Sequence, residues 1–362
     1  MKKNIAVIKG DGVGPEIVDK AIKVLNKISE KYSHEFNLEY ADMGGVSIDK
    51  YGIPLTDENL DKCKKSDSVL LGSVGGTKWD NIAPENRPEM GLLKLRKELN
   101  LYANIRPVKI LKSLEYASPL KETICKDIID FVIVRELTGG VYFGEHKFET
   151  INGIRHASDI MSYTETEIRR IGKTAFEIAR KIKKPLTSVD KANVLHTSKL
   201  WREIMNDLAK EYSDIKYNDM YVDNAAMQIA SNPSQFGVIV TENMFGDILS
   251  DEASVIMGSI GMAPSASLSD GTFGMYEPIH GSAPDIAGMD LANPIGTILS
   301  LAMMLRYSFD MTDEADNIEN AVYKAIDDNY RTHDIMPKYN TMSYSYKEVK
   351  CSEMGDIIVS NI

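Results

Sequence analysis

Short apolar segments alternate with amphipathic helical segments in the first part of the chain. Residues 5–8 (IAVI) and 68–74 (SVLLGSV) are predicted to be buried strands, and the apolar positions of residues 17–28 recur every three or four residues. Such alternation predicts an α/β sheet covered by helices. The same style returns near the C-terminus, with helices predicted over residues 292–309 and 315–330.

The pattern changes in the middle of the chain, after Arg106. Residues 130–134 (DFVIV) predict a buried strand, and a two-residue alternation over 148–160 predicts a β-ribbon. The following pattern predicts helices at 164–183 and 198–212 with a strand at 186–194 between them. We therefore expect the middle third to form a domain of its own. Residues 258–294 are rich in Gly, Pro, Ser and Ala and show little periodicity.

Composition narrows the class of protein. The 362 residues suffice for two domains or one large α/β unit. The net charge of -11 is unfavourable for binding nucleic acid or an anionic membrane, so an anionic ligand requires a local cationic site. The three cysteines are widely spaced, which indicates neither a disulfide framework nor a zinc site and fits a reducing compartment. The apolar run near the N-terminus is too short for a signal peptide, and these features together predict a soluble cytoplasmic protein.

A pair of aspartates suggests a divalent metal site. Asp247 and Asp251, in the predicted helix NMFGDILSD, are four residues apart and share one helix face. Two carboxylates there repel each other unless a cation lies between them. A lone D-x-x-x-D is more often a solvated acidic face, but the apolar neighbours Phe245 and Leu249 favour a metal site at the edge of the core. A third candidate ligand is Asp223, in YVDNAAM.

Three arginines could bind an acid. Arg96, Arg106 and Arg135 each carry a planar fork that pairs with a carboxylate, and each charge-assisted hydrogen bond contributes about 1.5–3 kcal/mol. Any one of them alone is more often a surface ion pair. Arg135 is the strongest candidate because it ends an apolar strand beside a double-glycine turn. The same turn carries Tyr142, either a core tyrosine or a proton donor.

Three further motifs allow two interpretations each. GDGVGPE, residues 10–16, is a strand-to-helix turn that does not match G-x-G-x-x-G, so a plain tight turn is as compatible as a phosphate-binding loop. Lys191, in VDKANVL, follows a strand and is either a solvated end or a base. EPIHGSAPDIAG, residues 277–288, is either an ordinary loop or one that admits an adenine and its ribose.

The motifs taken together resemble the isocitrate/isopropylmalate dehydrogenase family of β-decarboxylating dehydrogenases. The matching segments run in family order over nearly the whole chain: GDGVGPE, LLGSVGGTKWD, RPEMGLLKLRKELNLYANIRP, VRELTGGVYFGE, VDKANVL, YVDNAAMQ, TENMFGDILSDEAS, and EPIHGSAPDIAG with LANP. The resemblance implies a two-domain α/β fold, not a Rossmann fold, with mixed sheets flanked by helices. It implies a cofactor-binding domain over residues 1–104 and 260–362, a dimerisation domain with a β-ribbon arm over residues 105–259, and an active site in the cleft between the domains.

The resemblance also implies roles for individual residues. Asp247 and Asp251 would bind Mg²⁺ or Mn²⁺ together with Asp223 of the partner subunit in a homodimer, and Lys191 would likewise cross the interface. Tyr142, Lys191 and Asp223 would be catalytic, and the three arginines would bind the carboxylates of a small di-acid. The expected NAD site consists of Glu277, His280, Gly281, Ser282, Ala283, Pro284, Asp285, Ile286, Ala287 and Asn293. Asp285 and Ile286 match the NAD-using members of the family.

Substrate choice within the family depends on one helix. Glu89, Leu92 and Leu93, with Val194 from the other subunit, match its substrate positions, although two leucines are ordinarily core residues of an amphipathic helix. Their apolar side chains suit an isopropyl group. We therefore expect NAD-dependent oxidative decarboxylation of (2R,3S)-3-isopropylmalate to 4-methyl-2-oxopentanoate and CO₂, in leucine biosynthesis. The alternatives are relatives acting on isocitrate, homoisocitrate, tartrate or malate, and a metal-dependent phosphotransferase, which would lack its usual G-x-x-x-x-G-K-[ST] motif.

Overall fold

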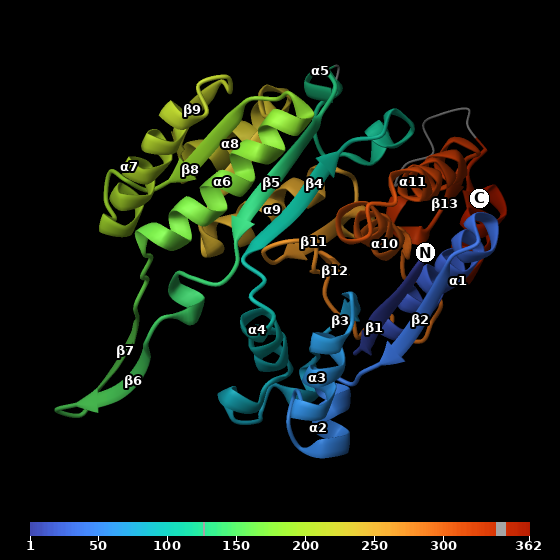
Figure 1. The fold of residues 1–362 in the computed structure, drawn as a ribbon, viewed down its shortest axis with the longest axis horizontal. Coiled ribbons are helices and arrows are strands. Elements are labelled where there is room, and N and C mark those ends of the chain that lie inside the picture. The colour runs from blue at the N-terminus through green and yellow to red at the C-terminus, as the bar shows by residue number, and fades with distance from the viewer. Residues whose placement is uncertain (126, 338–344) are drawn as a thin grey trace. The chain divides into compact units, whose positions relative to one another are not determined.

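The chain folds into two compact units, shown as a ribbon in Figure 1. The computed structural model describes residues 1–125, 127–337 and 345–362. Unit 1 consists of Met1–Leu101, Ile110–Pro119 and Ser254–Ile362, and unit 2 of Tyr102–Lys109 and Leu120–Ala253. The domain boundaries expected from the sequence follow residues 104 and 259. That expectation does not include Ile110–Pro119 in the first domain, whereas the structure assigns this segment to unit 1. That segment belongs to unit 1 because Arg331 donates to the Ser113 carbonyl at 2.9 Å and Tyr116 to the Ile335 carbonyl at 2.7 Å.

Unit 1 is built on a mixed sheet with the strand order β2-β1-β3-β12-β11. Its strands are β1 (Lys2–Gly10), β2 (Glu35–Tyr40), β3 (Ser68–Ser73), β11 (Pro264–Leu268) and β12 (Gly274–Pro278), with a small separate pair of β13 (Tyr330–Arg331) and β14 (Lys347–Glu348). Its helices are α1 (Gly14–Tyr32), α2 (Gly45–Tyr51), α3 (Asp57–Lys65), α4 (Pro88–Glu98), α10 (Ile295–Ser308), α11 (Thr312–Asp327) and α12 (Cys351–Asn361). Only β11 and β12 run antiparallel to each other among the described pairs of this sheet.

Helix α10 forms the centre of unit 1. Its residues are apolar or small nearly all round, and most of them are buried. A helix of that composition has no solvent face, so it must be covered on several sides. It packs against β11 and β12 on one side and against α1 and α11 on others.

The strands of unit 2 lie side by side in a mixed sheet in the order β4-β5-β10-β8-β9. The strands are β4 (Ala103–Lys109), β5 (Asp130–Glu136), β8 (Leu186–Asp190), β9 (Tyr217–Tyr221) and β10 (Val238–Thr241). The helices are α5 (Glu122–Cys125), α6 (Glu165–Ile182), α7 (His196–Glu211) and α8 (Val222–Ser231), while α9 (Asn243–Ile256) begins in unit 2 and ends in unit 1. β4 and β5 are antiparallel, whereas β5, β10, β8 and β9 are parallel neighbours.

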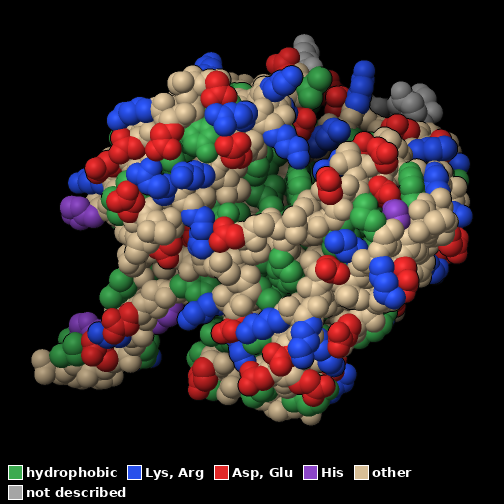
Figure 2. All heavy atoms as spheres, viewed as in Figure 1, with side chains coloured by type: hydrophobic (Ala, Val, Ile, Leu, Met, Phe, Trp, Pro, Cys, Tyr) green, Lys and Arg blue, Asp and Glu red, His purple; other side chains and the backbone are tan. Residues whose placement is uncertain are grey.

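A two-stranded arm projects from unit 2, as Figure 1 shows. It consists of β6 (His146–Ile151) and β7 (Ile154–Asp159), paired antiparallel. Every residue of both strands is exposed, including Phe148 and Ile154. Figure 2 shows hydrophobic side chains beside charged ones along this arm. The predicted β-ribbon is therefore confirmed, and its apolar residues lie uncovered in the single chain.

Most predicted elements are confirmed, with differences at their ends. The predicted helix over 164–183 is α6, which begins after a capping box formed by Thr164 and Glu167. The strand predicted over 186–194 ends instead at Asp190, where the carboxylate accepts the Ala192 N–H at 2.9 Å and turns the chain. Strands β11 and β12 were missed because their Gly, Pro and Ser residues hide the strand pattern. Among the described residues, no helix has the length and apolar content needed to cross a membrane.

Candidate active site

The register of β4 and β5 gathers polar side chains on one face of the unit 2 sheet. Asn104 pairs with Arg135 across the two strands, and Arg106 follows Asn104 by two residues on β4. Residues directly opposite each other, and residues two apart, point to the same side of a sheet. Asn104, Arg106 and Arg135 are all buried. Buried arginines require partners, so this face must present acceptors to both guanidinium groups.

Helix α9 supplies carboxylate partners for both arginines. Arg135 Nη1 forms a very short ion pair with Asp247 Oδ1. Arg106 Nη1 lies 3.1 Å from Asp251 Oδ1, and its Nη2 lies 3.8 Å from Asp247 Oδ1. The two aspartates predicted to share a helix face therefore do so, and they face two of the three predicted arginines.

Asp247 and Asp251 still have room for a cation. Asp251 keeps 58% of its side chain exposed and Asp247 keeps 35%. Burial raises the pKa of Asp251, the Arg106 charge opposes that rise, and the neighbouring Asp247 charge adds to it. Mutual repulsion of this kind is relieved by a divalent cation with oxygen ligands, so the residues fit Mg²⁺ or Mn²⁺.

Tyr142 reaches the same carboxylates from a short 3-10 turn, Val141–Phe143. Its hydroxyl donates to Asp247 Oδ2 at 3.1 Å. Burial raises the pKa of Tyr142, and the nearby Asp247 charge raises it further. The hydroxyl is therefore protonated at neutral pH and can act as a donor.

Buried carboxylates hold the glycine turn that precedes Tyr142. Glu136 accepts the Thr138 N–H at 3.1 Å and the Gly139 N–H at 2.7 Å. A Cβ on Gly139 would lie 2.5 Å from Tyr163 Cε1, so the turn has no room for a larger residue. Glu136, Tyr163 and the nearby Glu242 were not predicted as site residues. Glu136 and Glu242 lie in the quoted segments VRELTGGVYFGE and TENMFGDILSDEAS, but only the structure shows that all three are buried around the glycine turn.

Lys191 and Asp223 meet each other within one chain. Lys191 Nζ lies 2.7 Å from Asp223 Oδ1, and this hydrogen bond holds the pKa of Asp223 below its usual value. Asp223, Asp247 and Asp251 do not bring their ligand atoms within 4.8 Å of one another in the described part of a single chain. Each chain alone therefore assembles the aspartate pair but not the triad.

The predicted cofactor loop lies in unit 1 against the first glycine turn. The Val13 N–H donates to the Ser282 carbonyl at 2.8 Å, and a Cβ on Gly12 would lie 1.9 Å from that oxygen. The turn GDGVG therefore supports the loop by close backbone contact. Of the two interpretations left open for it, the tight turn describes this role.

Two features of the loop fit a nucleotide. The buried Nε2 atom of His280 has no hydrogen-bond partner, which is true of few buried side-chain atoms in the described residues. Burial also lowers the pKa of His280. Gly281 and Gly288 would meet no heavy atom within 4 Å of an added Cβ. A bound adenine and ribose would supply hydrogen-bond partners and would need open space, and the loop has an unpartnered polar atom and two unobstructed glycines. The loop therefore fits NAD.

The remaining predicted residues of unit 1 lie on α4 and on β12 and its following loop. Arg96 Nη2 forms a buried ion pair with Glu277 Oε1 at 3.0 Å, so a predicted substrate residue contacts a predicted cofactor residue. On α4, Glu89 is exposed and Leu92 and Leu93 are partly exposed, not core leucines. In the loop, Asp285 is exposed and Ile286 partly so. Val194, in unit 2, is 63% exposed.

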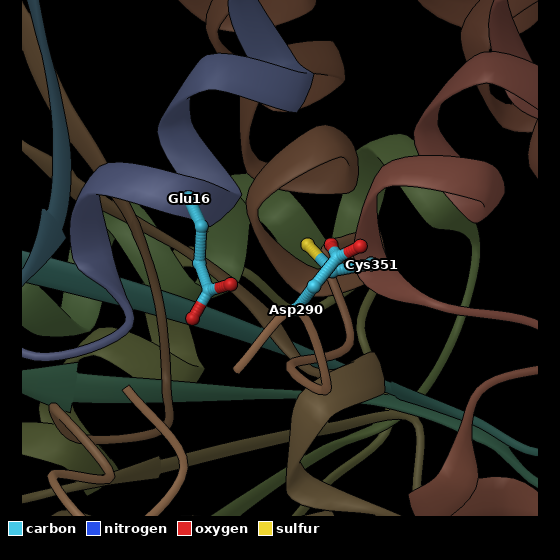
Figure 3. A group of neighbouring side chains, drawn as sticks. All are labelled: Glu16, Asp290 and Cys351. Atoms are coloured by element: carbon cyan, nitrogen blue, oxygen red, sulfur yellow. The ribbon is translucent and has the colours of Figure 1, made fainter. Parts of the chain in front are cut away.

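A second acidic cluster in unit 1 is structural. Glu16, Asp290 and Cys351 place their ligand atoms within 4.8 Å of one another (Figure 3). Asp290 already accepts the N–H and hydroxyl of Ser352 at the start of α12, at 2.8 and 2.6 Å. Burial raises the pKa of Cys351 to about 12, so the thiol stays protonated and is a poor metal ligand. The cluster joins the end of the cofactor loop to α1 and α12.

The chain resembles known proteins along nearly its whole length. The sequence model of the isocitrate/isopropylmalate dehydrogenase family matches residues 4–358. The chain is 58% identical to 3-isopropylmalate dehydrogenase of Helicobacter hepaticus over 100% of both chains, and 54% identical to that of Clostridium acetobutylicum over 99% of both. Its structure matches isocitrate dehydrogenase of Methylococcus capsulatus with a TM-score of 0.87 and 33% identity, covering 99% of each chain. With a family match along almost its whole length, the chain belongs to the isocitrate/isopropylmalate dehydrogenase family.

Proposed function

We propose that the protein oxidatively decarboxylates (2R,3S)-3-isopropylmalate to 4-methyl-2-oxopentanoate and CO₂ with NAD⁺, in cytoplasmic leucine biosynthesis. The observation that carries the proposal is the convergence of Arg106, Arg135 and Tyr142 on the Asp247–Asp251 pair. Cationic, proton-donating and metal-binding groups then lie within reach of one small di-acid. Full-length relatives with this activity in their names support the substrate.

Residues from the two chains of a dimer would together provide substrate binding and proton transfer. Arg96, Arg106 and Arg135 would hold the two carboxylates, and Lys191, oriented by Asp223, would accept the C2 hydroxyl proton. Tyr142 would donate a proton to C3 after CO₂ departs, which completes the product. When bound, a divalent cation held by Asp247 and Asp251, with Asp223 of the partner subunit, would polarise the C2 oxygen, and NAD⁺ would accept the hydride.

We place NAD⁺ in the loop formed by Glu277, His280–Ala287 and Asn293. The exposed carboxylate of Asp285 can accept hydrogen bonds from ribose hydroxyls and would repel a 2′-phosphate. That arrangement favours NAD⁺ over NADP⁺.

The proposed assembly is a homodimer formed through unit 2. Large apolar side chains of this unit are exposed, including Phe148 at 73%, Met227 at 60% and Ile248 at 60%. Uncovered apolar residues on an arm and on two helices favour burial against a second copy. The dimer would complete each metal site with Asp223 of the partner subunit and supply Lys191 and Val194 to it.

A comparison of substrates tests the proposed reaction. NADH and CO₂ formation would be measured with 3-isopropylmalate, isocitrate, homoisocitrate, tartrate and malate, each with NAD⁺ and Mn²⁺. Because Leu92, Leu93 and Val194 offer apolar surface, we expect the highest kcat/KM with 3-isopropylmalate. A higher kcat/KM with a tricarboxylate would contradict this substrate assignment, and absence of NADH formation with all five would contradict the reaction class.

A further inference from the structure

Two buried asparagines hold the arginines of unit 2 in the same way. Asn104 Oδ1 accepts the Nε–H of Arg106 at 2.7 Å, and Asn243 Oδ1 accepts the Nε–H of Arg135 at 3.0 Å. The two asparagines are 0% and 1% exposed. One asparagine is on β4 and the other opens α9, so the repetition does not follow from a shared element.

The hydrogen bond to Nε decides which way each guanidinium faces. A guanidinium is planar and its five N–H groups point in fixed directions, so fixing Nε also directs Nη1 and Nη2. In Arg106, Nη1 then reaches Ser250 Oγ at 2.6 Å and Asp251 at 3.1 Å. In Arg135, Nη1 reaches Asp247. The outer nitrogens of both arginines are therefore aimed at the α9 carboxylates.

The surroundings leave Arg135 little freedom to turn elsewhere. A Cβ on Gly246 would lie 2.6 Å from Arg135 Cγ, so the arginine stem lies directly on α9. Asn243 also donates through Nδ2 to the Gly139 carbonyl at 3.0 Å, which ties the arginine to the turn leading to Tyr142. Asn243, Gly246 and Asp247 thus contact one side chain from one helix face.

Both acceptors of the Nε–H groups are neutral amides and not carboxylates. A carboxylate could accept the same Nε–H, and buried arginines usually pair with carboxylates. Each guanidinium already faces an α9 carboxylate through Nη1. An amide satisfies the Nε–H without adding a further negative charge beside the guanidinium, so the attraction of this face for an anion is not weakened further. We propose that Asn104 and Asn243 are positioning residues that orient Arg106 and Arg135 towards the α9 carboxylates without adding a negative charge that would oppose the carboxylates of the substrate; this inference rests on the proposed di-acid function.

The test substitutes Asn104 with aspartate and with alanine in the full-length enzyme. Asn104→Asp keeps the shape and the acceptor but adds a negative charge, whereas Asn104→Ala removes the acceptor and adds no charge. We expect KM for 3-isopropylmalate to rise roughly 10- to 100-fold in the aspartate variant and by a smaller factor in the alanine variant. KM for NAD⁺ should change little in either, because the cofactor loop belongs to unit 1.

Asn243→Asp should also raise KM for 3-isopropylmalate. Asn59→Asp is the matched control, because Asn59 is a buried asparagine on α3 whose side-chain oxygen lies 3.5 Å from Lys62 Nζ. Its KM for 3-isopropylmalate should equal that of the wild type. Thermal unfolding of each variant separates loss of the fold from loss of binding.

Three outcomes overturn the inference. The first is an unchanged KM for 3-isopropylmalate in Asn104→Asp, and the second is a KM for 3-isopropylmalate that rises less in Asn104→Asp than in Asn104→Ala. The third is a KM for NAD⁺ that rises as much as the KM for 3-isopropylmalate. Calorimetric binding of 3-isopropylmalate with Mn²⁺ gives the same comparison without turnover. If the wild-type protein uses a different 2-hydroxy di-acid, the proposed substrate is contradicted but the role of the asparagines is not. The KM values of the variants for that acid then support or overturn the role of the asparagines by the same comparison.

Discussion

Lys191 Nζ lies 2.7 Å from Asp223 Oδ1, although the two residues are 32 positions apart in the chain. Lys191 follows β8, and Asp223 is in the first turn of α8. Parallel pairing of β8 with β9 brings these ends together, with Asp190 opposite Tyr221. The pair links the proposed base to a proposed metal ligand.

Lys191→Met should lower kcat by roughly 10²–10⁴-fold while changing KM for 3-isopropylmalate much less. Methionine preserves the apolar stem but cannot accept a proton. Steady-state kinetics with NAD⁺ and Mn²⁺ provide the measurement. Lys199→Met, at an exposed position of α7, is the control and should retain wild-type kcat. An unchanged kcat in Lys191→Met would exclude Lys191 as the base.

Mixing two inactive variants should restore activity if the site is shared between subunits. In a heterodimer of Lys191→Met and Asp247→Asn chains, one site would combine intact Lys191 from one chain with intact Asp247 from the other. At a Mn²⁺ concentration that activates the wild type but not Asp247→Asn, we expect activity to appear after the variants are unfolded together and refolded, and not when either is refolded alone. Failure of the mixture to regain activity, with heterodimers verified by native mass spectrometry, would contradict the shared site.

Asp247→Asn should raise the Mn²⁺ concentration needed for half-maximal activity by at least about tenfold. The substitution removes a charged oxygen ligand and also weakens the hold of Arg135. Titration of metal-stripped protein with Mn²⁺ measures the effect. Asp313→Asn, at an exposed position of α11, should behave like the wild type. A wild-type metal requirement in Asp247→Asn would remove Asp247 from the ligand set.

Asp285→Lys combined with Ile286→Tyr should shift the preference from NAD⁺ towards NADP⁺. A lysine can pair with a 2′-phosphate that the aspartate repels. The ratio of kcat/KM for the two cofactors is the quantity to compare. Asp270→Lys adds the same charge at another exposed position and should leave the ratio unchanged. A retained NAD⁺ preference in the double variant would count against the assignment of the loop.

Glu242→Gln should stabilise the protein more at neutral than at acidic pH. Glu242 is 4% exposed, and burial raises its pKa. A carboxyl group whose pKa is higher in the folded state binds its proton more tightly there, so the free energy of unfolding falls as pH rises through that folded pKa. Glutamine does not titrate and can still accept the Phe245 N–H, which Glu242 accepts at 2.8 Å.

The measurement is the difference in Tm between Glu242→Gln and the wild type from about pH 4.5 to about pH 8, a window above the ordinary glutamate pKa. That difference should become more positive as pH rises. Glu203→Gln, at an exposed position of α7, should show no such trend. A constant difference across the window would mean that Glu242 titrates normally.

Local patterns in the sequence were enough to predict the α/β class, α6 and α7, the arm and the shared face of Asp247 and Asp251. These features depend on residues a few positions apart, whose spacing directly sets a helix face or a strand face. Local patterns also marked the arginines, Tyr142 and residues 277–288 as candidates with two possible interpretations, and the family resemblance assigned a role to each of them.

Only the tertiary structure decided how distant segments meet. The opposition of Asn104 and Arg135 comes from the register of two strands, and the pairing of Lys191 with Asp223 comes from the crossover through α7 that makes β8 and β9 parallel neighbours. The sequence does not show which groups Asn104, Glu136 and Asn243 contact, and an amide or a buried carboxylate gains its role from its hydrogen-bond partner. The aspartate face of α9 was therefore predictable from spacing, whereas the direction of the arginines facing it was set by hydrogen bonds between residues far apart in the chain.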